Sequence, residues 1–247
     1  MFRWFHKLAS TRNFYRLSEI LAPWLAGLCA ILLAVGIFQG LVVAPTDYEQ
    51  GESYRIIFVH VPSAWLSLFI YMVMAFCSLL VIVWKMKLAD MVAEVSAAIG
   101  ASFTFLALAT GSLWGRPMWG TWWEWDARLT SELVLLFIYI GYMALRASID
   151  NPATRARAAA ILALVGVVNI PIIKFSVDWW NTLHQPASIM KFDKPSIHIS
   201  MLQPLLLCAI GFTLFYFVVM LLKTRTLILE RESKSAWVQE RVMENRL

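Results

Sequence analysis

The sequence predicts an all-α protein that crosses a membrane six times, as three observations indicate. Hydrophobic residues make up 60% of the 247 positions and charged residues only 15%, a composition typical of polytopic membrane proteins. Six apolar stretches approach or exceed the roughly 20 helical residues that span a hydrocarbon core. They lack the two-residue alternation of a barrel strand, and a helix satisfies its own backbone hydrogen bonds in lipid. We therefore predict a single all-α membrane domain over residues 1–247.

Each span is an apolar run bounded by charged or turn-forming residues. The first follows a basic lead-in that we expect to lie on the inner membrane surface. The second begins beside Pro62, which suits a helix start, the third follows the charged turn WKMKLAD, and the fourth follows a tryptophan-rich segment. The fifth begins after Asn151 and Pro152, and the segment after the sixth mixes charges as an amphipathic helix does. The predicted spans are 21–43, 61–84, 92–113, 129–145, 158–177 and 201–222.

Lysine and arginine are distributed unevenly between the two sides of the membrane. With both termini inside, 15 of the 21 fall on the cytoplasmic side, whereas the 16 acidic residues divide 8 and 8. The positive-inside rule concerns Lys and Arg, so this asymmetry predicts cytoplasmic termini and a loop at residues 114–128 on the outer side of the membrane. We attribute the net charge of +5 to topology and to contact with anionic membrane lipid, and we expect no nucleic-acid partner.

The segment WGRPMWGTWWEWD, residues 114–126, holds five tryptophans in thirteen positions. Tryptophan prefers the headgroup level of a bilayer, but an aromatic belt needs only one or two residues per helix end. A porphyrin offers wide apolar faces for stacking, and its propionates accept hydrogen bonds from arginine or indole N–H groups. An aromatic cage for a quaternary ammonium ion is the competing interpretation, although it needs one pocket rather than a platform. The candidate cofactor-contacting residues are Trp114, Trp119, Trp122, Trp123 and Trp125.

Two histidines flank this segment at the same predicted membrane level. His60 lies at the outer mouth of the second span, and His184 lies beyond the outer end of the fifth. One histidine at a helix mouth is more often an interfacial or capping residue than a ligand. A pair at matched depth beside an aromatic platform favours axial ligation of haem iron, which suits holding and handing over haem rather than oxygen chemistry. His198 is the rival second ligand, and His6 lies in the cytoplasmic lead-in.

Charged residues on the same side are suited to hold haem propionates. Arg55 precedes His60 by five residues, and Arg128 follows Asp126 at the start of the fourth span. The guanidinium group matches a carboxylate in geometry. Arg128 also lies four residues before Glu132, so an i,i+4 pair is the alternative. Glu132 falls inside the span, where an ionisable group indicates a functional role, and pairing with Arg128 is the simplest one.

The pattern WGxxxWGTWWxWD at residues 114–126 occurs together with VHVP around His60 and WWNTLHQ around His184. These motifs resemble the CcmC family of haem-handling (WWD-domain) proteins of the system I pathway for cytochrome c maturation, and the likeness extends over nearly the whole chain. It implies that His60 and His184 are axial ligands. It also implies that the tryptophan segment, including Asp126, receives haem b transiently and non-covalently at the periplasmic face. Glu124 places a charge between two of the tryptophans, and His198 matches no motif of the family.

The resemblance further implies partners and a location. Members of the family work in the bacterial inner membrane as multi-pass proteins, together with the ABC transporter subunits CcmA and CcmB and the small membrane protein CcmD. They load haem onto the chaperone CcmE. Relatives that join haem to apocytochrome carry more spans, so we expect no independent enzyme activity, only assistance of covalent haem attachment to CcmE.

The leading hypothesis is thus periplasmic haem binding followed by delivery to CcmE. The alternative is a haem exporter or transport channel subunit of an ABC-type complex. A channel predicts ionisable or polar residues deep in several spans, and the sequence offers few besides Glu132 and Asn169. A quinol-oxidising membrane cytochrome would place its histidines at mid-span, where this sequence has none.

Overall fold

The computed structural model describes residues 9–180, 182, 184 and 197–244, and the regular structure in this part of the chain is helical. A π-helical turn, η1 (Gln39–Val43), extends the first helix, and a 3-10 turn, η2 (Glu52–Ile56), leads into the second. The α-helices are α2 (Thr11–Phe38), α3 (Ile57–Trp84), α4 (Lys87–Trp119), α5 (Ala127–Ala147), α6 (Pro152–Gly166), α7 (Asn169–Trp179), α8 (Ile199–Arg231) and α9 (Ala236–Glu244).

Six helical stretches are long and apolar enough, by length and composition, to cross a membrane, which confirms the predicted all-α fold with six spans. The helices extend beyond the predicted spans; α4, for example, ends at Trp119 rather than at residue 113. Hydropathy marks only the apolar part of a helix, whereas backbone hydrogen bonds continue through neighbouring polar and aromatic residues. The stretches are Thr11–Val43, Glu52–Trp84, Lys87–Trp119, Ala127–Ala147, Pro152–Trp179 and Ile199–Arg231.

The fifth span is broken into α6 and α7, whereas the sequence predicts one run over 158–177. Pro171 has no N–H, and its ring clashes with the carbonyl four residues earlier, that of Val167. The N–H groups of Val167 and Val168 bond instead to carbonyls three residues earlier, at 3.3 and 3.4 Å. Asn169 then donates from Nδ2 to a main-chain carbonyl of α5 at 2.9 Å, which fixes the start of α7.

Two buried tyrosines join the helices around this break. The Tyr71 hydroxyl of α3 donates to a carbonyl near the end of α6 at 2.9 Å, and the Tyr139 hydroxyl of α5 donates to a carbonyl of α3 at 2.8 Å. Their ring centroids lie 5.2 Å apart. A Cβ atom at Gly100 or Gly166 would collide with one of these hydroxyls, so the two glycines let α4 and α6 approach the tyrosine pair closely.

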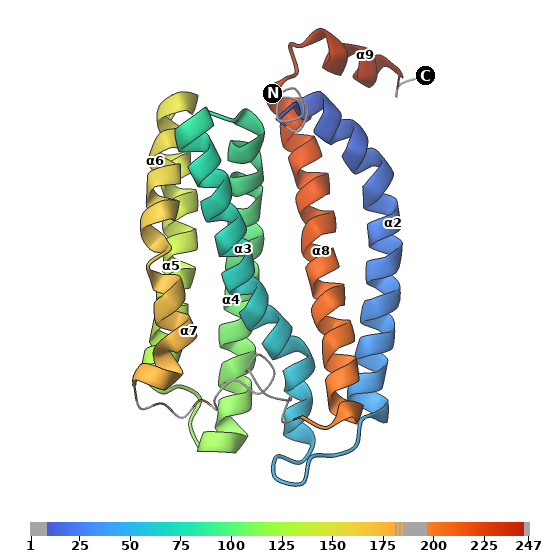
Figure 1. The fold of residues 1–247 in the computed structure, drawn as a ribbon, viewed down its shortest axis with the longest axis vertical. Coiled ribbons are helices and arrows are strands. Elements are labelled where there is room, and N and C mark those ends of the chain that lie inside the picture. Colours follow the sequence, from blue (N-terminus) through green and yellow to red (C-terminus); the bar gives the residue numbers. More distant parts are fainter. Residues whose placement is uncertain (1–8, 181, 183, 185–196, 245–247) are drawn as a thin grey trace.

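The helices form two groups, and the helix axes in both lie roughly parallel to one another (Figure 1). Helices α3 to α7 gather on one side, and α2 packs on α8 on the other, with α8 also contacting α3 and α4. The last turn of α4 and the first turns of α3 and α5 lie at one end, here called the tryptophan end. The start of α2, the end of α8 and the short α9 lie at the opposite end, where Arg241 of α9 pairs with Glu19 of α2 at 2.6 Å.

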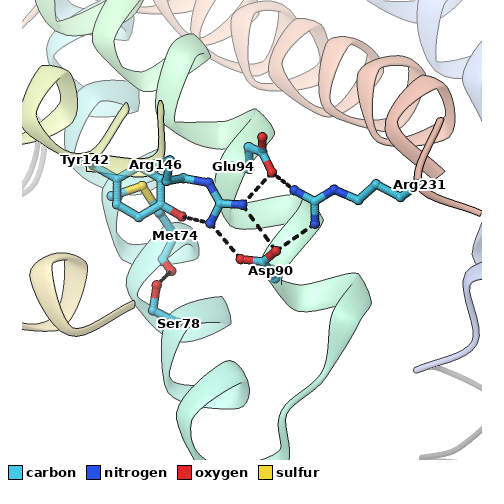
Figure 2. Close-up of polar contacts among 7 residues, drawn as sticks. All are labelled: Met74, Ser78, Asp90, Glu94, Tyr142, Arg146 and Arg231. Carbon is cyan, nitrogen blue, oxygen red and sulfur yellow. Dashed lines mark hydrogen bonds and ion pairs between the residues drawn. The ribbon is translucent and has the colours of Figure 1, made fainter. Parts of the chain in front are cut away.

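A network of ion pairs closes the opposite end (Figure 2). Arg146 of α5 lies 2.7 Å from Asp90 and 2.6 Å from Glu94, both on the first turns of α4. Arg231 at the end of α8 lies 2.8 Å from Asp90 and also pairs with Glu94. Two guanidinium groups therefore share two carboxylates, and the network ties α4, α5 and α8 together.

We expect Arg146→Met to destabilise the fold more than Arg231→Met. Without Arg146, the buried carboxylate of Asp90 and the partly exposed one of Glu94 keep like charges with Arg231 as their shared partner. Breaking a buried ion pair from one side typically costs about 3–5 kcal/mol. The Arg231 side chain is 25% exposed against 6% for Arg146. Water therefore screens the charges around Arg231 more, and the loss of its ion pairs costs less stability. Thermal unfolding of the full chain in detergent measures the difference, and equal losses of Tm would contradict it.

Candidate functional site

His60 lies in the first turn of α3, at the tryptophan end. Its Nδ1 atom is 3.1 Å from the Ala107 carbonyl and 3.1 Å from the Thr110 hydroxyl, both on α4. The Trp114 ring meets the imidazole edge-on at a centroid distance of 5.6 Å. Gly111 lets α4 approach, because a Cβ there would lie 3.0 Å from His60 Cε1. The contacts of Nδ1 leave Nε2 as the nitrogen available to a ligand.

His184 lies beyond the end of α7 and packs against the tryptophan segment. Trp119 meets its imidazole at a centroid distance of 4.9 Å, and Asp126 Oδ2 lies 3.5 Å from Nδ1. Burial lowers the pKa of His184; Asp126 acts against this shift and Arg128 adds to it. The imidazole is therefore neutral at pH 7 and keeps a lone pair for a Lewis acid. His60 and His184 lie close enough for a positive charge on one imidazole to act on the other.

Asp126 connects α5 to the segment that carries His184. Its Oδ1 accepts the Leu129 N–H at 2.8 Å and caps the start of α5, a role that aspartate serves well. Its Oδ2 accepts a hydrogen bond from the Thr182 hydroxyl, and Thr182 Oγ1 in turn accepts the His184 N–H at 3.1 Å. One carboxylate thereby holds a helix start and the backbone beside a candidate ligand.

The tryptophan segment is partly helical rather than a loop throughout, because α4 continues to Trp119 and ends at Gly120 in the left-handed conformation, with φ +79°. This is the usual place for a glycine after a helix end. Trp114 Nε1 donates to the side chain of Gln50, in the connection between η1 and η2, at 3.0 Å. The helix therefore fixes the two rings that contact the histidines.

The other three tryptophans follow Gly120 and differ in exposure. Trp122 is 55% exposed and Trp125 is 73% exposed, whereas the Nε1 atom of Trp123 is buried and lacks a hydrogen-bond partner among the described residues. The rings of Trp123 and Trp125 meet edge to face at 5.3 Å. A buried N–H without a partner is unfavourable, so Trp123 offers a donor to a ligand, and its exposed neighbours offer aromatic surface.

The two predicted arginines differ in how far the protein already uses them. Arg55 donates from Nη1 and Nη2 to two carbonyls of the turn after α2, at 2.6 and 3.0 Å, and pairs with Glu52. Arg128 donates from Nη1 to the Ile173 carbonyl of α7 at 2.8 Å. Among the described residues Arg128 forms no ion pair with Glu132, and the buried Oε1 of Glu132 has no hydrogen-bond partner. Arg128 thus keeps more N–H groups available beside the two histidines.

His198, the rival ligand, begins α8. Its Nδ1 accepts the Ser200 N–H at 3.3 Å and lies 2.8 Å from the Ser200 hydroxyl, so it serves as the helix cap. His6 lies outside the described residues.

Sequence analysis missed Gln50, Thr110 and Thr182. Thr110 precedes Trp114 by one helical turn and so faces the same way, a spacing that was available in the sequence.

Together these residues fit a planar aromatic ligand that carries a metal. Each of two neighbouring imidazoles has Nδ1 facing an acceptor, which leaves Nε2 for a metal ion. Trp123 supplies a buried donor without a partner, and Arg128 supplies a cation. The tryptophan segment places one aromatic ring against each histidine. This donor set matches haem, with its iron, its flat faces and its two carboxylates.

The model of a protein family described as heme exporter protein C (CcmC) matches residues 4–239 of the chain. A heme exporter protein C of Bradyrhizobium diazoefficiens is 55% identical over 92% of this chain and 86% of its own length. The heme exporter protein C of Escherichia coli K12 is 48% identical over 98% of both chains. A putative cytochrome c biosynthesis ccmC-like mitochondrial protein of Marchantia polymorpha is 50% identical over 84% of this chain and 88% of its own.

We expect the stability of the chain to fall as the pH is lowered from about 7.5 to about 5, and His184→Gln to reduce that loss. Burial lowers the pKa of His184 in the folded chain, so the unfolded chain binds more protons below the ordinary value of about 6.5. Stability from the neutral imidazole is complete above that value and is lost as the pH falls toward the folded-state pKa. The measurement is the stability of both proteins to unfolding in detergent across this pH range. The same dependence of stability on pH in the two proteins would contradict a lowered pKa for His184.

Proposed function

Because the chain belongs to the CcmC, or heme exporter protein C, family, we propose that it binds haem and delivers it during cytochrome c maturation. The observation that carries this proposal is the pairing of His60 and His184, each in edge-on contact with one tryptophan of a single segment. Haem, when bound, supplies an iron centre that takes two nitrogen ligands. The chain supplies those nitrogens and the surface around them.

In this proposal His60 and His184 bind the iron through Nε2, and the tryptophan segment covers the porphyrin. Arg128 is the principal propionate partner, since a single carbonyl engages its guanidinium. Trp123 Nε1 is a second donor of suitable chemistry. Arg55 contributes its remaining N–H groups and holds the turn between α2 and α3.

We place the site on the periplasmic side of the bacterial inner membrane and both termini in the cytoplasm. The support is the Lys and Arg asymmetry, because the opposite end of the bundle carries most of the basic residues. Such a site delivers haem b to CcmE outside the membrane, with CcmA, CcmB and CcmD as further partners. The exposed rings of Trp122 and Trp125 are suited to meet a partner or the cargo itself.

Transport of haem through the chain is the second candidate, because α6 and α7 form a broken span and Glu132 is buried beside it. Broken helices and buried ionisable groups are typical of transport paths. The fully buried rings of Tyr71 and Tyr139 fill the space between α3 and α5. This filling favours a site at the end of the bundle over a path along it.

We expect the full chain to bind haem with the absorption spectrum of six-coordinate, bis-imidazole iron. His60→Ala and His184→Ala should each lose that spectrum, because each removes one nitrogen ligand. His198→Ala should keep it, because His198 caps α8. It is the matched control, since it removes an imidazole from the same end of the molecule.

Wild type without haem would overturn the proposed function. Loss of the six-coordinate spectrum in His198→Ala, together with its retention in His60→Ala or His184→Ala, would overturn the ligand assignment. Thermal unfolding of each apo variant separates loss of haem from loss of fold.

Replacing Trp119, Trp123 and Trp125 together by alanine should strongly reduce transfer of haem to CcmE. The change removes the ring beside His184, the buried donor and the most exposed ring of the segment. Covalent haem on CcmE, measured by staining after gel electrophoresis, reports the transfer. Trp84→Ala, at the far end of α3, is the control, and equal loading by both variants would contradict a role for the segment.

A further inference from the structure

The two candidate ligands have different partners at Nδ1. His60 faces a backbone carbonyl and a hydroxyl, both neutral. His184 faces a carboxylate, that of Asp126. When one imidazole nitrogen binds a metal, the group that accepts a hydrogen bond from the other nitrogen tunes the basicity of the ring. This difference therefore makes the two imidazoles unequal donors.

The Thr110 hydroxyl fixes the proton of His60. It donates its single hydrogen to the Leu106 carbonyl at 2.6 Å or to the Ala107 carbonyl at 3.3 Å, so it can only accept from His60. The Ala107 carbonyl is likewise an acceptor. Nδ1 of His60 therefore carries the hydrogen, and Nε2 is an ordinary neutral nitrogen donor.

Asp126 gives His184 a stronger partner. The residue is only 8% exposed, so water does little to screen its charge. Oδ2 lies 3.5 Å from Nδ1, and Nδ1 has no hydrogen-bond partner elsewhere in the described part of the chain. A hydrogen bond formed between these two atoms when the iron binds would be charge-assisted, and such bonds are roughly twice as strong as neutral ones.

The backbone contacts favour the same ligand. The Thr182 hydroxyl joins Asp126 to the main chain of His184, so the carboxylate that faces the ring also holds the backbone of this residue. No comparable anion faces His60, whose polar contacts in the described residues are those with Ala107 and Thr110.

We propose that His184 is the ligand that stays on the iron during transfer, that His60 is the ligand that is exchanged, and that Asp126 is the positioning residue that creates the difference. This inference rests on the proposed function. In the exchange the bond between iron and His60 Nε2 breaks as a nitrogen or oxygen donor of the accepting protein forms its own bond. The oxidation state of the iron does not change in this step.

The first test uses His60→Gly and His184→Gly with added imidazole. In His60→Gly the retained ligand is intact, so imidazole should restore the six-coordinate spectrum. In His184→Gly the stronger ligand is lost, so restoration should need at least about tenfold more imidazole, the scale on which outer-shell partners change metal affinity. Equal requirements, or a lower requirement for His184→Gly, would overturn the proposal.

The second test compares Asp126→Asn with Thr110→Val and decides the matter if imidazole rescues neither glycine variant. Asparagine keeps the helix cap and the shape but removes the charge. We expect Asp126→Asn to weaken haem binding by roughly 10- to 100-fold and to raise the haem reduction potential, because a less basic imidazole stabilises ferric iron less. Thr110→Val leaves the Ala107 carbonyl in place and should change both quantities less.

Equal effects of the two substitutions, or a larger effect of Thr110→Val, would overturn the inequality of the ligands. Thr110→Ser keeps the hydroxyl and is the matched control for helix packing. The wild-type spectrum separates the two levels of the argument. Its absence removes the proposed function, whereas a bis-imidazole wild type with symmetric variants removes only the assignment of retained and exchanged ligands.

Discussion

The carboxylate of Asp126 is the contact on which the site geometry depends most. One oxygen ends the tryptophan segment by capping α5, and the other holds Thr182 and faces His184. A capping residue normally satisfies only backbone N–H groups of its own helix. Here the same side chain also fixes a segment more than fifty residues further along the chain. The tryptophan rings and the second histidine are therefore positioned together.

The broken fifth span explains how that segment reaches the site. Pro171 prevents a continuous helix, and α7 starts again with Asn169 bonded to α5. Arg128, two residues after Asp126, bonds to the middle of α7. The first turns of α5 thus contact both α7 and the residues beyond it, so the direction of α7 and the place of His184 are set by the same helix.

Much of this arrangement was predictable from the sequence. Long apolar runs identify six spans because lipid excludes unsatisfied backbone groups, and the motifs around His60 and His184 point to one end of the bundle. The break at Pro171 was not predicted, since a hydropathy window averages over a single proline. Thr110 and Thr182 were also missed, because their roles depend on which helices are neighbours. The capping role of His198 depends on where α8 begins, which the sequence leaves uncertain by a few residues.

Helix α4 reaches from the ion-pair network to the tryptophan segment. It has 33 residues, a length of about 50 Å at the usual rise per residue, with Asp90 and Glu94 near its start and Trp114 and Trp119 at its end. Arg231 and Arg146 form ion pairs with the first turns of α4, and Trp114 contacts His60 near its other end. The helix is thus a long rod held by ion pairs at one end of the bundle. A tilt imposed at that end would move the indole rings at the other end, so α4 links the two ends of the molecule mechanically.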